Sequence, residues 1–258
     1  LEPGAKNEVG VGVVWVRPST QTGCGANFDA IRIADEKAQA LFDADFELID
    51  GPDAPDLAVR ELDEEIIISI SNGGTSNNAN EDYEEADPII TNISESDTTG
   101  TLSDSTYNFQ GYIIYQLKNG LIGPAEYSDP DKARIVAQVD LKDDVDKLVN
   151  FSFDQTLGAD VPTLMVDGND EGIRHTFRVT EDAFATGDKN LVNFKTYYFS
   201  VIAYAHNNYK PYDPTDPNSQ KLPYLEGRKN IKVYTAIPHN PTPENNGSVL
   251  NAEYGDGP

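Results

Sequence analysis

The chain has 258 residues, of which 44 are acidic and 19 basic, so its formal net charge is −25. This balance excludes nucleic acid as a partner, because affinity for phosphates rests on Lys and Arg. No apolar run approaches the roughly 18 residues that a membrane-spanning helix needs, so we expect no membrane insertion. Three explanations of the acidity stay open: a solvated extracellular surface, divalent-cation sites, and adaptation to high salt.

A single cysteine, Cys24, rules out an internal disulfide. That is compatible with a cytosolic protein, and also with secreted bacterial proteins that rely on size rather than on cross-links. The sequence begins without Met and without a signal-like apolar segment. We therefore expect it to be a segment of a longer polypeptide.

Residues 1–50 predict the end of a preceding β-domain followed by a helix. Residues 8–16 alternate and are rich in Val, which is typical of a strand. Asn27 is then expected to cap a helix over residues 28–46. Apolar residues recur at helical spacing and predict a stripe that packs as a core face. The stripe consists of Ile31, Ala34, Ala38, Leu41 and Phe42.

Residues 50–55 are rich in turn formers and contain two prolines, which places a module boundary there. Residues 51–238 then predict one mainly β domain with a long polar insertion at 72–106. Loops beyond about 12–15 residues are usually functional or disordered. The expected strands are residues 57–62, 65–71, 109–117, 134–141, 148–153, 173–179, 196–205 and 231–237.

The remaining segments are expected to be irregular. Residues 161–172 predict a loop, and residues 209–225, with four prolines, predict a hairpin-like excursion. Residues 239–258 predict a Pro-rich linker.

Two stretches carry a resemblance to a known kind of module. Residues 109–115 read F-Q-G-Y-I-I-Y, and residues 197–204 read Y-Y-F-S-V-I-A-Y. With residues 55–69 they resemble fibronectin type III-like modules in large secreted or cell-surface proteins of Bacteroidota, many of which are exported by type IX secretion. The resemblance implies a fibronectin type III/Ig-like β-sandwich at an extracellular or cell-surface location. Its partners would be other domains of the same polypeptide.

The resemblance has two further implications. Tyr197 or Tyr198 is expected to be the corner tyrosine, whose hydroxyl ties a strand to a nearby loop. Secreted proteins of this group also carry O-glycans on Ser or Thr after Asp. The segments Asp97-Thr98-Thr99 and Asp104-Ser105-Thr106 fit that pattern, so Thr98 and Ser105 are candidate glycosylation sites.

Calcium is the one candidate cofactor. Ca²⁺ takes six to eight oxygen ligands, often from closely spaced acidic side chains in a turn. The turn at 167–172 offers four such side chains: Asp167, Asn169, Asp170 and Glu171. It lacks the full twelve-residue loop with its terminal Glu, so a solvated turn stays the alternative. Two weaker clusters are Asp140, Asp143, Asp144 and Asp146, and Asp213, Asp216 and Asn218.

Tyrosine is abundant, with 13 copies, and several gather near prolines toward one end of the predicted sandwich. They either pack loops onto the sandwich or form a face that contacts glycans or surface proteins, because Tyr offers rigid amphipathic area. The candidate binding residues are Tyr204, Tyr209, Tyr212 and Tyr224.

No catalytic residue is assigned. The sequence has no G-x-S-x-G elbow, and its three histidines, His175, His206 and His239, are far apart along the chain. Glycoside hydrolysis needs only two carboxylates at a set separation, which a sequence does not measure. We therefore predict a non-catalytic extracellular structural or adhesion module that spaces or presents parts of a larger protein. The alternative is a carbohydrate-binding module of a secreted enzyme.

Overall fold

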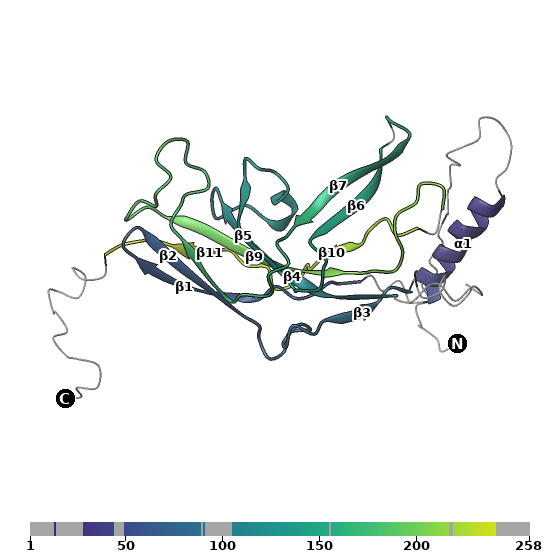
Figure 1. Cartoon of the computed structure of the whole chain (residues 1–258), viewed down its shortest axis with the longest axis horizontal. Coiled ribbons are helices and arrows are strands. Elements are labelled where there is room, and N and C mark those ends of the chain that lie inside the picture. The colour runs from purple at the N-terminus through teal and green to yellow at the C-terminus, as the bar shows by residue number, and fades with distance from the viewer. Residues whose placement is uncertain are drawn as a thin grey trace, which may run out of the picture.

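The structure is a computed structural model that describes residue 13 and residues 28–43, 49–88, 90, 105–154, 156–216 and 219–240. This part of the chain is mainly β with antiparallel sheets, which confirms the predicted class (Figure 1). Apart from residue 13, the strand predicted at 8–16 lies outside the described residues, as do Cys24, the cap Asn27 and residues 241–258 of the predicted linker.

The first sheet has three strands. β1 (Asp56–Leu62) and β2 (Glu65–Ser71) form a hairpin, and β8 (Thr176–Val179) pairs with the other edge of β2. Alternate residues of β2, namely Ile66, Ile68 and Ile70, are buried because a strand turns every second side chain to the same face.

The second sheet is built on two long central strands. β4 (Thr106–Leu117) pairs with β9 (Tyr197–His206) along most of its length. Short strands extend the sheet on both sides: β3 (Glu84–Ala86) and β5 (Ala133–Asp140) pair with β4, while β10 (Tyr224–Glu226) and β11 (Tyr234–Ala236) pair with β9.

Both faces of this second sheet are buried. One face packs against the first sheet, where Ile66 and Ile68 share a core with Tyr112 and Phe199. The opposite face carries a second core of ten residues: Ile113, Leu117, Ile122, Tyr127, Ala133, Leu148, Val166, Ile202, Tyr204 and Tyr224. Strands buried on both faces read as nearly continuous apolar runs, which explains why β4 and β9 are the clearest strands in the sequence.

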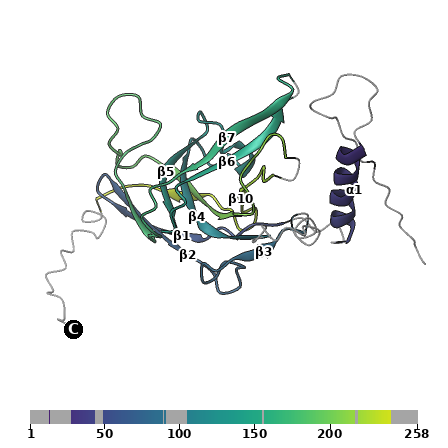
Figure 2. The same ribbon diagram turned by 45° about the vertical axis from the view of Figure 1, so that its right-hand side comes forward.

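The cover of the second core includes a two-stranded ribbon, β6 (Lys147–Asp154) and β7 (Ala159–Asp167). Figures 1 and 2 show this ribbon rising from the central sheet. The prediction of a loop at 161–172 is therefore wrong over most of its length. Pro162 and the polar residues of β7 interrupt the apolar alternation that would predict a strand. Proline is tolerated in a two-stranded ribbon because each strand forms a ladder on one edge only.

The long insertion is partly ordered rather than a plain loop. Asn78 is fully buried, and its side-chain oxygen accepts a hydrogen bond from the backbone N–H of Tyr83 at 3.2 Å. β3 then pairs with the start of β4. Residues 72–88 therefore belong to the packed body, whereas residues 91–104 lie outside the described part of the chain.

The predicted corner tyrosine is Tyr197. Its hydroxyl accepts a hydrogen bond from the backbone N–H of Val192 at 2.8 Å, while its ring is buried at the start of β9. This contact closes the loop before β9 onto the strand, as the sequence predicts.

Gly111 allows β4 to bulge between its partners. A Cβ at this position would lie 2.2 Å from the carbonyl oxygen of Val139 and 2.7 Å from the hydroxyl of Tyr204. The pairing of β4 with β9 shifts register between Phe109 and Gly111. Only glycine fits this crossing of strands, because any side chain would meet backbone atoms that have little room to move.

Helix α1 (Phe28–Asp43) stands beside the sheets rather than on them (Figures 1 and 2). The expectation that its apolar stripe packs as a core face is wrong for two of its members, since Ile31 is 53% and Phe42 59% exposed. Both faces of the central sheet are already covered by other segments, so the helix does not pack on that sheet.

The first and last strands of the β body lie side by side and run in the same direction. At one end the backbone N–H of Ala54 donates to the carbonyl of Lys229 at 3.0 Å. At the other end the backbone N–H of His239 donates to the carbonyl of Leu62, also at 3.0 Å. Between them, Asp56 accepts bonds from Lys232 at 2.6 Å and Tyr234 at 3.0 Å. The chain therefore enters and leaves this body at opposite ends of β1.

Candidate functional site

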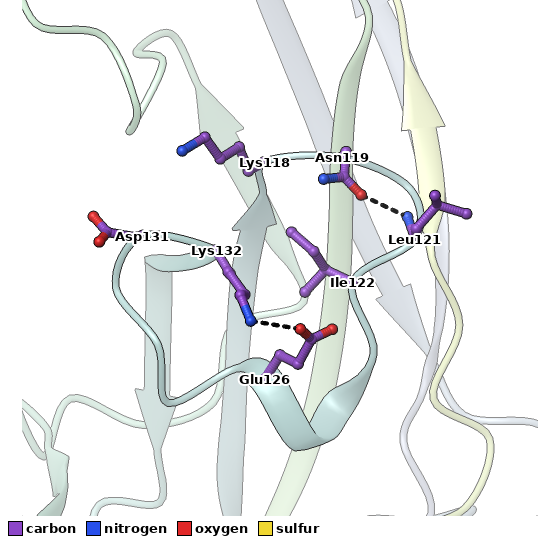
Figure 3. A pocket seen from close by; sticks show the side chains of 7 residues that line it. All are labelled: Lys118, Asn119, Leu121, Ile122, Glu126, Asp131 and Lys132. Atoms are coloured by element: carbon purple, nitrogen blue, oxygen red, sulfur yellow. Dashed lines mark hydrogen bonds and ion pairs between the residues drawn. The ribbon is translucent and has the colours of Figure 1, made fainter.

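A cavity of about 450 Å³ lies beside the connection between β4 and β5 (Figure 3). Its lining residues come from one stretch of chain: Lys118, Asn119, Leu121, Ile122, Glu126, Asp131 and Lys132. The volume falls within the range of small-molecule sites, about 300–1,000 Å³.

Local chemistry explains the shape of this connection. The side chain of Asn119 accepts a hydrogen bond from the backbone N–H of Leu121 at 2.9 Å, which closes a tight turn. Pro124 opens a short 3-10 helix, η1 (Pro124–Glu126). Tyr127 then anchors the connection, because its buried hydroxyl donates to Ser200 on β9 at 2.7 Å.

One ion pair crosses the cavity. The ammonium of Lys132 lies 2.7 Å from Glu126 and 3.6 Å from Asp129. Its hydrogen bond to Glu126 lowers the pKa of that carboxyl and raises the pKa of Lys132. Both side chains are about two-fifths exposed, so the pair contributes little to stability and mainly fixes the position of two opposite charges.

The sequence does hold a signal for this site that was missed. Asn119-Gly120 and Gly123-Pro124 are both turn signatures, and Asp129-Pro130 adds a third. Two lysines in this short segment also stand out in a chain with a large excess of acids. What the sequence does not reveal is that the turns fold back on each other and leave a hollow.

Three of the four candidate binding tyrosines are buried. Tyr204, Tyr209 and Tyr224 are each at most 6% exposed, and the rings of Tyr204 and Tyr224 pack at 5.4 Å in the second core. Burial raises the pKa of the Tyr224 hydroxyl well above its ordinary value. The prediction of a contact face is therefore wrong for these three, because they pack the loops onto the central sheet.

Tyr212 is the exception. Its ring stacks on Phe151 of β6 with centroids 3.8 Å apart and an interplanar angle of 14°. Its hydroxyl donates to Asp160 at 3.0 Å, and Asp160 also pairs with Lys221 at 2.8 Å. Phe153, two residues along β6, is 52% exposed. Aromatic rings and a charged pair therefore gather on one side of the ribbon.

The turn predicted to bind calcium is tied to the neighbouring turn at 140–146 by backbone N–H groups that donate to carboxylates. Asp170 accepts from the backbone N–H groups of Asp143 at 2.8 Å and Asp144 at 3.1 Å. Asp140 is buried and accepts from the backbone N–H of Asp170 at 3.3 Å, and desolvation raises the pKa of the Asp140 carboxyl. Asp167 instead faces Lys147 at 3.5 Å.

The four predicted calcium ligands are therefore not gathered around one point. Across the described parts of the chain, no three Asp, Glu, His or Cys side chains are placed as a metal ion would require. Asp167, Asp170 and Glu171 belong to that searched set, and Asn169 lies between them. The second acidic cluster, Asp140 to Asp146, contacts this same turn through hydrogen bonds with Asp170. Asn218 of the third cluster lies outside the described residues.

The other predicted residues fall as follows. Thr98 lies outside the described residues, while Ser105 is half-buried and its carbonyl accepts from the backbone N–H of Asp87 at 2.8 Å. His175 precedes β8, with its Nε2 2.7 Å from a carboxylate oxygen of Glu81. The hydroxyl of Tyr112 donates to the same oxygen at 3.0 Å. This group ties the insertion to both sheets.

No protein-family model matches the chain, and neither a curated protein nor a solved structure is significantly similar to it. Among the described residues, no helix is both long and apolar enough to cross a membrane.

Proposed function

We propose that the chain carries a fibronectin type III-like module with a structural role, which spaces or presents parts of a larger extracellular or cell-surface protein. The observation that carries the proposal is the placement of the chain ends of the β body. A connector must receive the chain at one end and release it at the other. Ala54 and His239 do so at opposite ends of β1, which spans about 20 Å at about 3.3 Å per residue.

The sheet arrangement supports the fold part of the proposal. Three strands, β1, β2 and β8, face a sheet built on β4 and β9, and the chain passes between the two sheets as a sandwich requires. The hydrogen bond of Tyr197 adds the corner contact that the resemblance implies.

The parallel contact of β1 and β11 supports the mechanical part. Tension on the two ends pulls these strands past each other, so their contacts are loaded together rather than one at a time. Asp56 stands at the centre of this contact, because it accepts from both Lys232 and Tyr234. A module that bears load between neighbouring domains needs such an arrangement.

Single-molecule stretching of the full chain by its two ends tests this role. We expect Asp56→Ala to lower the unfolding force, because the contact between β1 and the segment 230–234 loses three hydrogen bonds, from Asn230, Lys232 and Tyr234. Glu65→Gln is the matched control, since it weakens the exposed pair of Glu65 with Arg178 on the same sheet, away from β11. Equal unfolding forces for the parent chain and Asp56→Ala would contradict the proposal.

A carbohydrate-binding role is the second candidate, and one observation favours it. Tyr212 and Phe151 form a stacked pair next to the exposed ring of Phe153, with Asp160 and Lys221 beside them. Sugars are bound through aromatic faces combined with polar groups. Binding to a glycan array that disappears in Phe153→Ala, and survives in Phe194→Ala, would establish this role. Phe194 is also exposed, at 74% against 52% for Phe153, and lies in the loop before β9 rather than on the ribbon.

A further inference from the structure

The charges that line the cavity beside η1 balance to zero. Two ammonium groups, Lys118 and Lys132, meet two carboxylates, Glu126 and Asp131. The chain as a whole carries −25. The acidic surface as a whole repels anions and attracts cations. The neutral lining of this cavity therefore differs from the rest of the surface.

Two of these four charges are already satisfied and two are not. Lys132 and Glu126 pair with each other at 2.7 Å. Within the described part of the chain, the ammonium of Lys118 and the carboxylate of Asp131 have neither a hydrogen bond nor an ion pair. Figure 3 shows both on the same side of Lys132. One open positive charge and one open negative charge thus border the same hollow.

The opposite side of the cavity is apolar. Ile122 is buried there and Leu121 is 94% exposed, and Figure 3 shows both on the far side of Lys132 from Lys118 and Asp131. Asn119 contributes a further polar group: its side-chain oxygen accepts from Leu121, which leaves its amide nitrogen as a donor. The cavity therefore offers a positive group with an amide donor, a negative group and an apolar wall.

We propose that this cavity binds a free α-amino acid with an aliphatic side chain. Its carboxylate would meet Lys118 and the amide nitrogen of Asn119, and its ammonium would meet Asp131. Its side chain would lie against Leu121 and Ile122. A zwitterion suits a lining of zero net charge, and a volume of about 450 Å³ accommodates a molecule of this size. Because the charges are exposed, the expected dissociation constant is millimolar.

Titration of the full chain with L-leucine, followed by backbone amide NMR, tests the site. We expect saturable shifts confined to residues 118–122 and 126–132. Lys118→Gln and Asp131→Asn should each weaken binding by about fivefold, the upper end for an exposed ion pair. Lys142→Gln and Asp146→Asn are matched controls, because they remove exposed charges of the same sign elsewhere. Equal weakening in the controls would mean that net charge, not the cavity, is responsible, and would overturn the proposal.

Two analogues separate the contacts. N-acetyl-leucine keeps the carboxylate without the ammonium, so its binding should depend on Lys118 and be indifferent to Asp131→Asn. Leucine amide keeps the ammonium without the carboxylate and should show the reverse. If N-acetyl-leucine binds as tightly as leucine, the zwitterion assignment is wrong. The absence of saturable shifts with leucine at high millimolar concentration would overturn the site itself. None of these outcomes bears on the mechanical role proposed above, which stretching tests separately.

Discussion

Asp182 organises the loop before β9. Its carboxylate accepts from the side chain of Gln116 at 2.7 Å, from the backbone N–H of Phe184 at 2.9 Å and from Lys195 at 2.7 Å. Asp182 and Gln116 are both buried. Burial by itself raises the pKa of the Asp182 carboxyl, but the hydrogen bonds, that of Lys195 first, outweigh it and the pKa is lowered. Asp182 therefore joins three segments of the fold, a role that the sequence pattern does not predict.

This node predicts a pH dependence of stability. A carboxyl whose pKa is lower in the folded chain than in the unfolded chain stabilises the fold at pH values above its unfolded pKa. That contribution is lost as the pH falls through the folded pKa. Asp182→Asn should cost about 1–2 kcal/mol of unfolding free energy at pH 7, because Lys195 is half-exposed and can be hydrated instead. The difference between parent and variant should shrink between about pH 5 and about pH 2.

Urea unfolding at several pH values measures this difference. Asp146→Asn is the control, since Asp146 is an exposed aspartate and its removal should leave the free energy of unfolding within about 0.5 kcal/mol of the parent. A cost for Asp182→Asn that stays constant down to the lowest pH would show that the charge of Asp182 is not what stabilises the loop.

At the scale of elements, the two kinds of strand differ in how they are supported. β4 and β9 have neighbours on both edges and packed side chains on both faces. β6 and β7 form a ladder only with each other, and single hydrogen bonds tie β6 to the segment that leads into β10: the backbone N–H of Phe151 donates to the carbonyl of Lys221 at 2.7 Å, and Asn150 bonds the backbone of Tyr224. The buried side chains of the ribbon, Leu148 and Val166, lie at its base. Leu157 and Leu164 are more than half exposed. The ribbon therefore depends on the sheet below it for stability.

Hydrogen exchange should report this difference. We expect the amides of β4 and β9 to exchange only with global unfolding, because opening them would disrupt both cores. The amides of residues 152–161 should exchange through local opening at much lower free energy. Exchange of the ribbon at the same free energy as β9 would mean that it is an integral part of the cooperative unit.

The elements also differ in how well the sequence predicts them. β1, β2, β4 and β9 are confirmed close to their predicted bounds, because alternation and β-branched or aromatic residues make them plain. β7 is missed, and β3 and β10 are too short to leave a pattern of their own. In helix α1, Ile31 and Phe42 are exposed, so an apolar stripe at helical spacing predicts the helix but not the surface that it packs against.

At the scale of the whole molecule, the net charge of −25 raises the question of bound calcium. We expect thermal unfolding in millimolar calcium and in EDTA, at fixed ionic strength, to give the same midpoint. The reason is that the carboxylates of Asp140 and Asp170 accept from backbone N–H groups, and that of Asp167 faces Lys147. A site filled at about 100 times its Kd would add about 2.7 kcal/mol, and a shift of that size would contradict this expectation.

The sequence by itself determined the mainly β class and the positions of the central strands, and it narrowed the tyrosine that ties a loop to its strand to Tyr197 or Tyr198. These follow from local alternation and composition, which burial on two faces imposes directly on the residues. The tertiary structure alone decided which tyrosines are buried and where the ribbon packs. It also decided that carboxylates of the acidic turns accept hydrogen bonds from the backbone of those turns, and that residues 118–132 line a cavity. Those features depend on contacts between segments far apart in the chain, or on how turns fold back, and spacing along the sequence does not encode either.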